Sequence, residues 1–193
     1  MSQVRSVSLS ERDSVLATIV LAFSTDPMAR WAWPDAPTYY STMAEFTMAF
    51  GGAAFDHGSA DVSGEFAAAA LWLPPGIEPD RERMGEITAA SSSPRVLEEI
   101  TLLMEQVAAL EPTEPHWYLP LIGTDPAHQG NGHGSALLAH ATERFDREGA
   151  LAVLESSNPR NIPLYKRHGF RILGEAQYGS SPSLVPMVRE PRR

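Results

Sequence analysis

The run Gln129-Gly130-Asn131-Gly132-His133-Gly134 constrains the fold of this chain more than any other feature. Its three glycines stand between a strand candidate at 117–122 and a helix candidate at 135–148. Glycine allows a positive φ angle and lets a backbone approach a ligand closely. The first N–H groups of a helix are unpaired and lie at the positive end of its dipole. The run therefore predicts a strand-loop-helix unit whose loop is either a phosphate cradle or a flexible connector.

Two common phosphate-binding motifs do not fit this run. A P-loop needs Gly-Lys-Ser or Gly-Lys-Thr after its glycines, and no lysine stands here. The dinucleotide fingerprint needs Gly-x-Gly-x-x-Gly early in a βαβ unit, with an acidic residue about 20 positions later. The glycines at 130, 132 and 134 have a different spacing, so both alternatives fall behind.

Hydrophobic periodicity and turn residues predict the other elements. They are a strand at 4–9, a helix from a Ser10 cap to the break at Asp26-Pro27, a helix at 38–50, two strands within 61–73, one amphipathic helix at 81–110, a strand at 150–154, a short helix within 158–169, and a hairpin of 171–178 with 183–188. Pro120 cannot donate a ladder hydrogen bond, so a break or bulge is expected in the strand at 117–122. This order predicts an α/β (α+β) fold with a mostly antiparallel sheet and one parallel section.

Composition sets the class of protein and excludes some partners. The 193 residues suit a single domain at 1–193, with 81–111 as a helical insert that shapes a binding site. The net charge of −9 argues against nucleic acid as a partner. No apolar run is long enough for a membrane span, and the first residues lack a signal-peptide core, so a cytoplasmic protein is expected. The chain has no cysteine, and its six histidines show no metal-ligand spacing, so no metal is expected.

Two short patterns in the second half carry a family resemblance. Gln129, Gly132 and Gly134 form the pattern Gln-x-x-Gly-x-Gly, and residues 164–170 read Leu-Tyr-x-x-x-Gly-Phe. Their order, with one predicted helix and one predicted strand between them, resembles the GCN5-related N-acetyltransferase (GNAT) superfamily. The resemblance covers 116–178, whereas the first 115 residues match only in layout. Further matches resemble the puromycin N-acetyltransferase subgroup, at His128-Gln129-Gly130, Gly134-Ser135-Ala136 and Pro159-Arg160-Asn161.

The resemblance implies how the chain folds and which ligand it binds. It implies a GNAT fold, with a twisted, mostly antiparallel sheet of about six or seven strands flanked by helices. In that fold acetyl-CoA lies between two splayed strands, which would be 117–122 and 151–155 here. Its pantetheine pairs with the backbone of the first strand, and its pyrophosphate lies at the glycine run. The implied cofactor-binding residues are Leu121, Ile122, Gln129, Gly130, Asn131, Gly132, His133, Gly134, Ser135, Asn158, Asn161 and Tyr165.

The resemblance also implies the catalytic residues. Tyr165 holds the position that in many relatives donates a proton to the leaving thiolate, although a core tyrosine is the other interpretation. Glu155, at the end of the second splayed strand, is the candidate base that deprotonates the amine, directly or through water. His116 and Tyr118 are alternative bases, and Glu155 could also be a solvated strand end. The absence of cysteine agrees with direct transfer in a ternary complex.

The sequence predicts the chemical class of the acceptor less specifically than it predicts the cofactor. The leading interpretation is transfer of an acetyl group to a primary amine of a small molecule. The alternatives are a protein or peptide N-acetyltransferase and a non-catalytic CoA-binding regulatory module. Aromatic candidates for the acceptor site are Trp31, Trp33, Tyr39, Tyr40 and Trp72, although core packing explains most such residues. The apolar stripe on 97–110 is either an interface of a homodimer or plain core.

Overall fold

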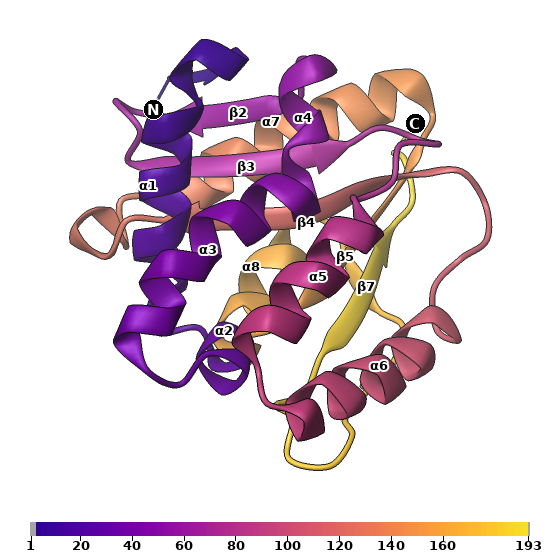
Figure 1. Cartoon of the computed structure of the whole chain (residues 1–193). Coiled ribbons are helices and arrows are strands. Elements are labelled where there is room, and N and C mark those ends of the chain that lie inside the picture. Colours follow the sequence, from indigo (N-terminus) through magenta and orange to yellow (C-terminus); the bar gives the residue numbers. More distant parts are fainter. Residues whose placement is uncertain (1–2, 193) are drawn as a thin grey trace.

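A twisted seven-stranded sheet runs through the middle of the computed structural model, which describes residues 3–192 (Figure 1). The strand order is β1-β2-β3-β4-β5-β7-β6, and only the β4–β5 pair is parallel. This arrangement confirms the predicted mixed, mostly antiparallel sheet. The strands are β1 (Val4–Ser6), β2 (Ala60–Ser63), β3 (Ala68–Leu73), β4 (His116–Thr124), β5 (Leu151–Ser156), β6 (Arg171–Ile172) and β7 (Val185–Arg189).

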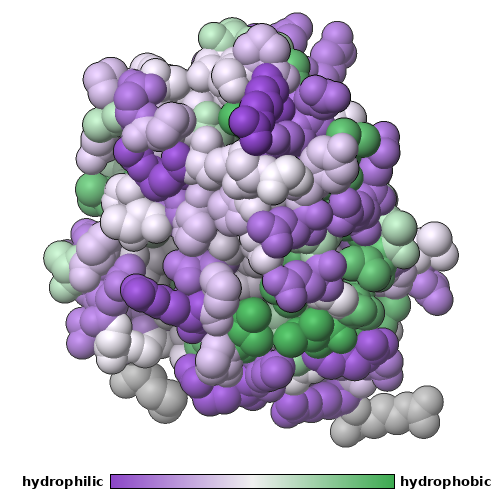
Figure 2. All heavy atoms as spheres, turned by 90° about the horizontal axis from the view of Figure 1, so that it is seen from below, coloured by the Kyte–Doolittle hydropathy of each residue, from purple (hydrophilic) through white to green (hydrophobic). Residues whose placement is uncertain are grey.

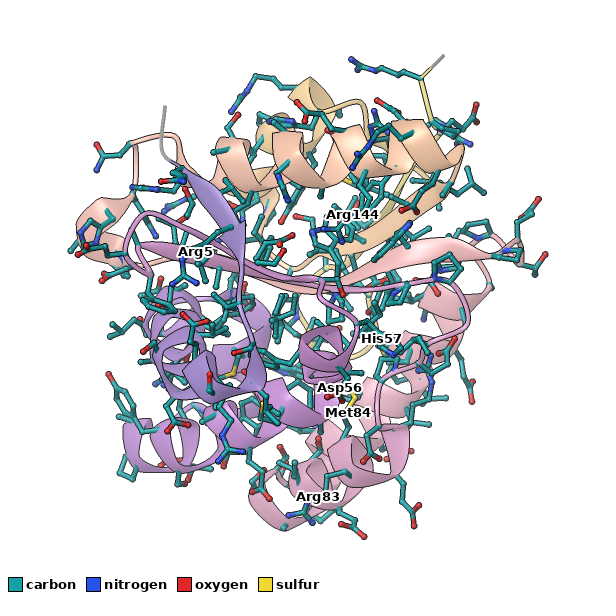
Figure 3. All side chains as sticks on the ribbon, turned by 90° about the horizontal axis from the view of Figure 1, so that it is seen from above. Arg5, Asp56, His57, Arg83, Met84 and Arg144 are labelled. Atoms are coloured by element: carbon teal, nitrogen blue, oxygen red, sulfur yellow. The ribbon has the colours of Figure 1, made fainter. Side chains whose placement is uncertain are left out.

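Helices cover both faces of the sheet. Viewed from above, α7 lies on one side of the strands, and the helices of the first half lie on the other (Figure 3). Arg144 reaches from α7 toward the sheet, where its guanidinium lies 5.3 Å from the ring centre of Trp117 (Figure 3). The helices are α1 (Arg12–Phe23), α2 (Pro27–Ala32), α3 (Ala36–Gly51), α4 (Ala53–Asp56), α5 (Arg81–Ser91), α6 (Pro94–Ala108), α7 (His133–Glu148) and α8 (Ile162–Arg167). Three short 3-10 helices are η1 (Leu9–Glu11), η2 (Pro126–His128) and η3 (Pro159–Asn161).

A β-bulge interrupts β4 at Pro120, as the sequence predicts. Leu71 pairs with Leu121 whereas Leu73 pairs with Tyr118, so β4 has one more residue than β3 in this interval. The extra residue reverses the alternation of side chains. Tyr118 and Leu121 therefore both pack into the core cluster on the α1 and α3 side of the sheet.

The bulge coincides with the point where β4 and β5 separate. The parallel pairing runs from His116 with Leu151 to Leu119 with Leu154 and does not continue beyond that pair. β4 itself extends to Thr124, still paired with β3 on its other edge. The edge of β4 that faces β5 is thus unpaired beyond Leu119 within the described chain. The splayed strands expected at 117–122 and 151–155 are present.

Several predicted boundaries are wrong for identifiable reasons. The single amphipathic helix at 81–110 is two helices, because Ser93 caps α6 and Pro94 occupies its first turn, where proline is favoured. The first helix does not start at Ser10, because that residue lies inside η1 and α1 begins at Arg12. The C-terminal hairpin is short, since β6 holds only two residues.

The core uses most of the aromatic residues that were candidates for the acceptor site. Trp33 and Tyr39 are buried in the cluster between α1, α3 and the sheet, and Trp72 is buried under α7. Tyr40 is exposed, and the Trp31 indole donates a hydrogen bond to Ser180 at 3.2 Å. Core packing therefore accounts for Trp33, Tyr39 and Trp72.

Candidate active site

A cleft of about 500 Å³ opens where β4 and β5 diverge. It extends from the glycine run to the junction between α1 and α2. Its lining residues include the end of α1, the bulged part of β4, the start of α7, the end of β5 and helix α8. A second hollow of about 440 Å³ lies between α3 and α5, away from these elements.

The glycine run forms a turn that leads directly into α7. Gly130 and Gly132 have φ angles of 80° and 83°, a region that residues with side chains rarely adopt. Gly132 is the N-cap of α7, and its carbonyl accepts the first helical hydrogen bond, from Ala136. The N–H groups of the three residues between them therefore have no partner within the helix. The turn presents the positive end of a 16-residue helix to the cleft.

The side chains at the start of α7 hold the turn in place. His133 Nδ1 lies 3.0 Å from the Ser63 hydroxyl, and the Ser135 hydroxyl lies 2.8 Å from His168 Nε2. A Cβ on Gly134 would lie 3.4 Å from Leu164 of α8, so glycine here keeps space open between the two helices. The geometry thus favours a ligand-binding turn over a flexible connector.

Most of the predicted site residues line the cleft. Gln129, Asn158 and Asn161 lie on it, although the Asn158 side chain also caps η3 by accepting the Arg160 N–H at 3.1 Å. Two predicted residues are not among its lining: Leu121, whose side chain is buried toward α3, and Asn131. The predicted residues that line the cleft are Ile122, Gln129, Gly130, Gly132, His133, Gly134, Ser135, Glu155, Asn158, Asn161 and Tyr165.

Tyr165 is buried in α8 and still lines the cleft. Its hydroxyl forms no hydrogen bond with another residue between 3 and 192. Burial raises the pKa of the phenol above its usual value of 10, and the negative charge of Asp26 adds to the effect. The phenol is therefore protonated at neutral pH and free to donate.

Glu155 lies on the acidic side of the cleft, at the end of β5. Its Oε2 atom accepts a hydrogen bond of 2.7 Å from the Tyr118 hydroxyl. Its Oε1 atom is buried and has no hydrogen-bond partner within the described chain. Burial raises the pKa of this carboxyl well above 4.5, and the neighbouring carboxyl of Glu111 raises it further. A carboxyl with an elevated pKa and a free oxygen has the properties of a general base.

Asp26, which the sequence marks only as the end of a helix, also lines the cleft. Its carboxylate caps α2 by accepting the N–H groups of Met28 and Ala29 at 3.0 and 3.1 Å. Its other oxygen accepts the Ser157 hydroxyl at 2.6 Å. Burial raises the pKa of Asp26, whereas these hydrogen bonds oppose the rise. The Asp26-Pro27 pair signalled only a helix boundary, and the contact with Ser157 spans 131 positions.

Charges of opposite sign occupy different elements of the cleft. The carboxyls come from the α1–α2 junction and β5, as Asp26 and Glu155. The arginines come from η3 and α8, as Arg160 and Arg167. Because α8 packs beside the start of α7, the part of the cleft that carries these arginines also includes the glycine turn. The cleft can thus hold a molecule with an anionic part at one end and a cationic group at the other. Residues 3–192 contain no cluster of three His, Cys, Asp or Glu side chains suited to a metal ion.

An open mixed sheet with a ligand cleft between splayed strands and a glycine turn at a helix start defines an α/β protein that can bind an anionic group at that helix start. A model of the acetyltransferase (GNAT) family matches residues 23–170, which is more than half of the chain. The chain therefore belongs to the acetyltransferase (GNAT) family. The puromycin N-acetyltransferase subgroup stays a prediction.

Individual relatives agree with this assignment. An uncharacterised N-acetyltransferase of Schizosaccharomyces pombe is 28% identical over 143 residues, which are 66% of this chain and 58% of that protein. The chain thus spans less than two thirds of that relative's length.

Solved structures show the same fold. A Corynebacterium glutamicum structure, described as histone acetyltransferase HPA2 and related acetyltransferase, has a TM-score of 0.72 at 24% identity, covering 100% of this chain and 98% of that one. A polyamine N-acetyltransferase of Drosophila melanogaster has a TM-score of 0.64 at 15% identity, covering 98% and 100%. An agmatine N-acetyltransferase has a TM-score of 0.66 at 15% identity, covering 97% and 98%. No helix within the described residues is long and apolar enough to cross a membrane.

Proposed function

We propose that this protein transfers an acetyl group from acetyl-CoA to a primary amine of a small molecule. The observation that carries the proposal is the single cleft with the start of α7 at one end and two buried carboxyls at the other. CoA is strongly anionic at its phosphates, and an amine is cationic in water. The positive helix start suits the CoA phosphates, and the two carboxyls suit the cationic amine.

The residues present fit acetyl-CoA. The unpaired edge of β4 beyond Leu119 offers backbone groups to the amides of pantetheine. The free N–H groups at the start of α7 suit a pyrophosphate, with Arg167 as a nearby cation. The side chains of Leu121 and Asn131 are not needed for this, because only their backbone groups are proposed to contribute. When bound, acetyl-CoA supplies an activated acetyl thioester with a thiolate leaving group.

The two proposed catalytic residues perform opposite proton transfers. In its ionised form, Glu155 takes a proton from the ammonium group of the acceptor, directly or through water, which leaves a neutral amine with a lone pair. Tyr165 donates its phenolic proton to the leaving sulfur. The buried position of both groups keeps water away from the transfer.

The size of the cleft supports a small acceptor. A volume of about 500 Å³ lies within the usual range of small-molecule pockets, roughly 300 to 1,000 Å³. Structures with the same fold include proteins named for acetylating agmatine, polyamines and arylalkylamines. Two neighbours are instead named for protein acceptors, as histone acetyltransferase HPA2 and as ribosomal-protein-S18-alanine N-acetyltransferase, at TM-scores of 0.72 and 0.53, so a protein acceptor is the second candidate. We also propose that the chain acts as one domain in the cytoplasm, with α5 and α6 shaping the acceptor side.

The test measures binding and turnover separately. Isothermal titration with acetyl-CoA compares the wild type with Gly134→Trp, which fills the space beside Leu164 without needing a positive φ angle. Gly85→Trp is the matched control, because a Cβ on this exposed helical glycine meets nothing within 4 Å. We expect Gly134→Trp to abolish binding and the control to retain it. Equal binding by both variants would place the ligand elsewhere.

Turnover is followed by thiol release with a panel of small primary amines and short peptides. Transfer to a small amine supports the proposal, and transfer to peptides alone supports the protein acetyltransferase. Tight acetyl-CoA binding without transfer to any acceptor would instead favour the regulatory module.

A further inference from the structure

Asp26 is unusual among the aspartates that cap helices in this chain. Asp35 and Asp80 cap α3 and α5, and each accepts one backbone N–H with its carboxylate exposed to solvent. Asp26 caps a helix of only six residues, yet it is only 7% exposed and lines the cleft. Capping alone does not require burial, because the exposed carboxylates of Asp35 and Asp80 satisfy the same kind of N–H group.

The hydrogen bonds of Asp26 leave capacity for a ligand. An ionised carboxylate has about four lone-pair sites. Two N–H groups share Oδ1, from Met28 and Ala29, whereas Oδ2 accepts only the Ser157 hydroxyl. One site on Oδ2 is therefore free. The hydrogen bonds from the backbone and Ser157 fix the direction in which the carboxylate points.

The charge of Asp26 is also uncompensated. Of the ion pairs within residues 3–192, none involves Asp26. A buried carboxylate without a cation is costly, and a cationic ligand would lower this cost. Its negative charge acts on the Tyr165 phenol, so the two groups are near each other in the cleft.

We propose that Asp26 binds the ammonium group of the acceptor and makes the cleft select amines that are positively charged in water. This inference rests on the proposed function. Asp26 holds the ammonium by a charge-assisted hydrogen bond on Oδ2, and Ser157 and the cap hold Asp26 in position. The proton that must leave the nitrogen moves to Glu155: an N–H bond breaks and an O–H bond forms. Asp26 is thus a specificity-determining residue, and the proposed base is a different carboxyl.

The test uses Asp26→Asn, which keeps the cap and removes the charge. Asparagine caps helices about as well as aspartate, and its amide nitrogen can donate to the Ser157 oxygen. Asp35→Asn makes the same change at an exposed cap outside the cleft and is the matched control. The substrate is the best alkylamine from the turnover panel, and the neutral probe is the alcohol with the same carbon skeleton, measured as a competitive inhibitor.

For Asp26→Asn we expect the KM for the amine to rise by about tenfold to a hundredfold, the range of a hydrogen bond to a charged group. The inhibition constant of the alcohol and the dissociation constant of acetyl-CoA stay within about twofold. Asp35→Asn changes none of these values. Asp26→Glu, which restores the charge, recovers part of the loss.

The experiment distinguishes failure of the Asp26 inference from failure of the proposed function. An unchanged KM in Asp26→Asn, while the wild type turns over the amine, overturns this inference and leaves the proposed function intact. Equal weakening of the amine and the alcohol overturns it too, because it shows a merely structural role for Asp26. If the wild type acetylates no amine although it binds acetyl-CoA, the proposed function fails and this inference fails with it.

Discussion

The Tyr165 phenol is buried, faces the cleft and has no internal hydrogen-bond partner within residues 3–192. These features suit an acid whose proton is released only to a bound group. For Tyr165→Phe we expect kcat to fall by about a hundredfold or more, the usual contribution of a positioned proton donor. Acetyl-CoA affinity should stay within about twofold, since the ring remains. Steady-state kinetics and titration calorimetry check this, with Tyr40→Phe on the surface as control. A variant with full kcat would show that Tyr165 is a core residue only.

The Glu111–Glu155 pair predicts a specific pH dependence. Glu155 acts as a base only when ionised, so kcat/KM should fall as the pH drops through its elevated pKa. The Glu111 carboxyl raises this pKa, so Glu111→Gln should lower it and move the acidic limb of the profile to lower pH. The profile of kcat/KM against pH measures the shift. Glu114→Gln, at an exposed neighbouring position, should leave the limb in place. An unmoved limb in Glu111→Gln would exclude Glu155 as the titrating base.

At the scale of elements, Glu99 attaches α6 to the loop before β7. Its carboxylate accepts the Ser180 N–H at 3.0 Å, the Ser180 hydroxyl at 2.6 Å and the Arg95 guanidinium at 2.8 Å. Gly179 has a φ angle of 57°, and a Cβ there would lie 2.5 Å from this carboxyl. The hydrogen bonds lower the pKa of Glu99 to about 2. The loop conformation and the ionised carboxylate therefore depend on each other.

This low pKa predicts the pH range in which the hydrogen bonds of the Glu99 carboxylate stop stabilising the protein. Since folding favours the ionised form, Glu99 stabilises the protein above about pH 4.5, and this contribution disappears as the pH falls toward 2. Glu99→Gln should be less stable than the wild type at neutral pH, and the difference should shrink in acid. Urea unfolding at a series of pH values measures it. A difference that is independent of pH would mean that the charge of Glu99 is not involved.

At the scale of the whole molecule, α5 and α6 are expected to unfold with the rest of the chain. The indole of Trp33, the residue that follows α2, donates a hydrogen bond of 2.8 Å to Ser91 of α5, so this contact contributes to the fluorescence of the four tryptophans. Unfolding followed by fluorescence and by far-UV circular dichroism should give coincident curves. Two separate transitions would show that 81–111 is an independent unit.

The homodimer also stays a prediction at this scale. The stripe on α6 is partly used internally, because Leu103 and Val107 pack against Ala176 and Leu184. Seen from below, hydrophobic residues gather in one patch on the surface among hydrophilic ones (Figure 2). Such a patch can be a protein interface. Light scattering should give a mass near twice the 21.0 kDa of the chain, and a mass equal to one chain would contradict the prediction.

The sequence alone determined the local features of this protein. The glycines at 130 and 132 permit positive φ angles, Pro120 cannot complete a strand ladder, and the apolar spacing of 135–148 is that of a helix with one buried face. These signals depend on the backbone of a few neighbouring residues, so the sheet, the glycine turn and most of the cleft could be predicted. The split at Ser93-Pro94 is also visible in the sequence, because serine followed by proline is a typical helix start.

Only the tertiary structure decided which distant side chains share the cleft. Asp26 meets Ser157 across 131 positions, and the connector after α6 brings Glu111 near Glu155 and Tyr118. No periodicity records such proximity, since it follows from how the layers pack. The same packing removes Asp26 and Glu155 from water, and burial without a cation is what makes these two carboxyls different from the other acidic residues of the chain.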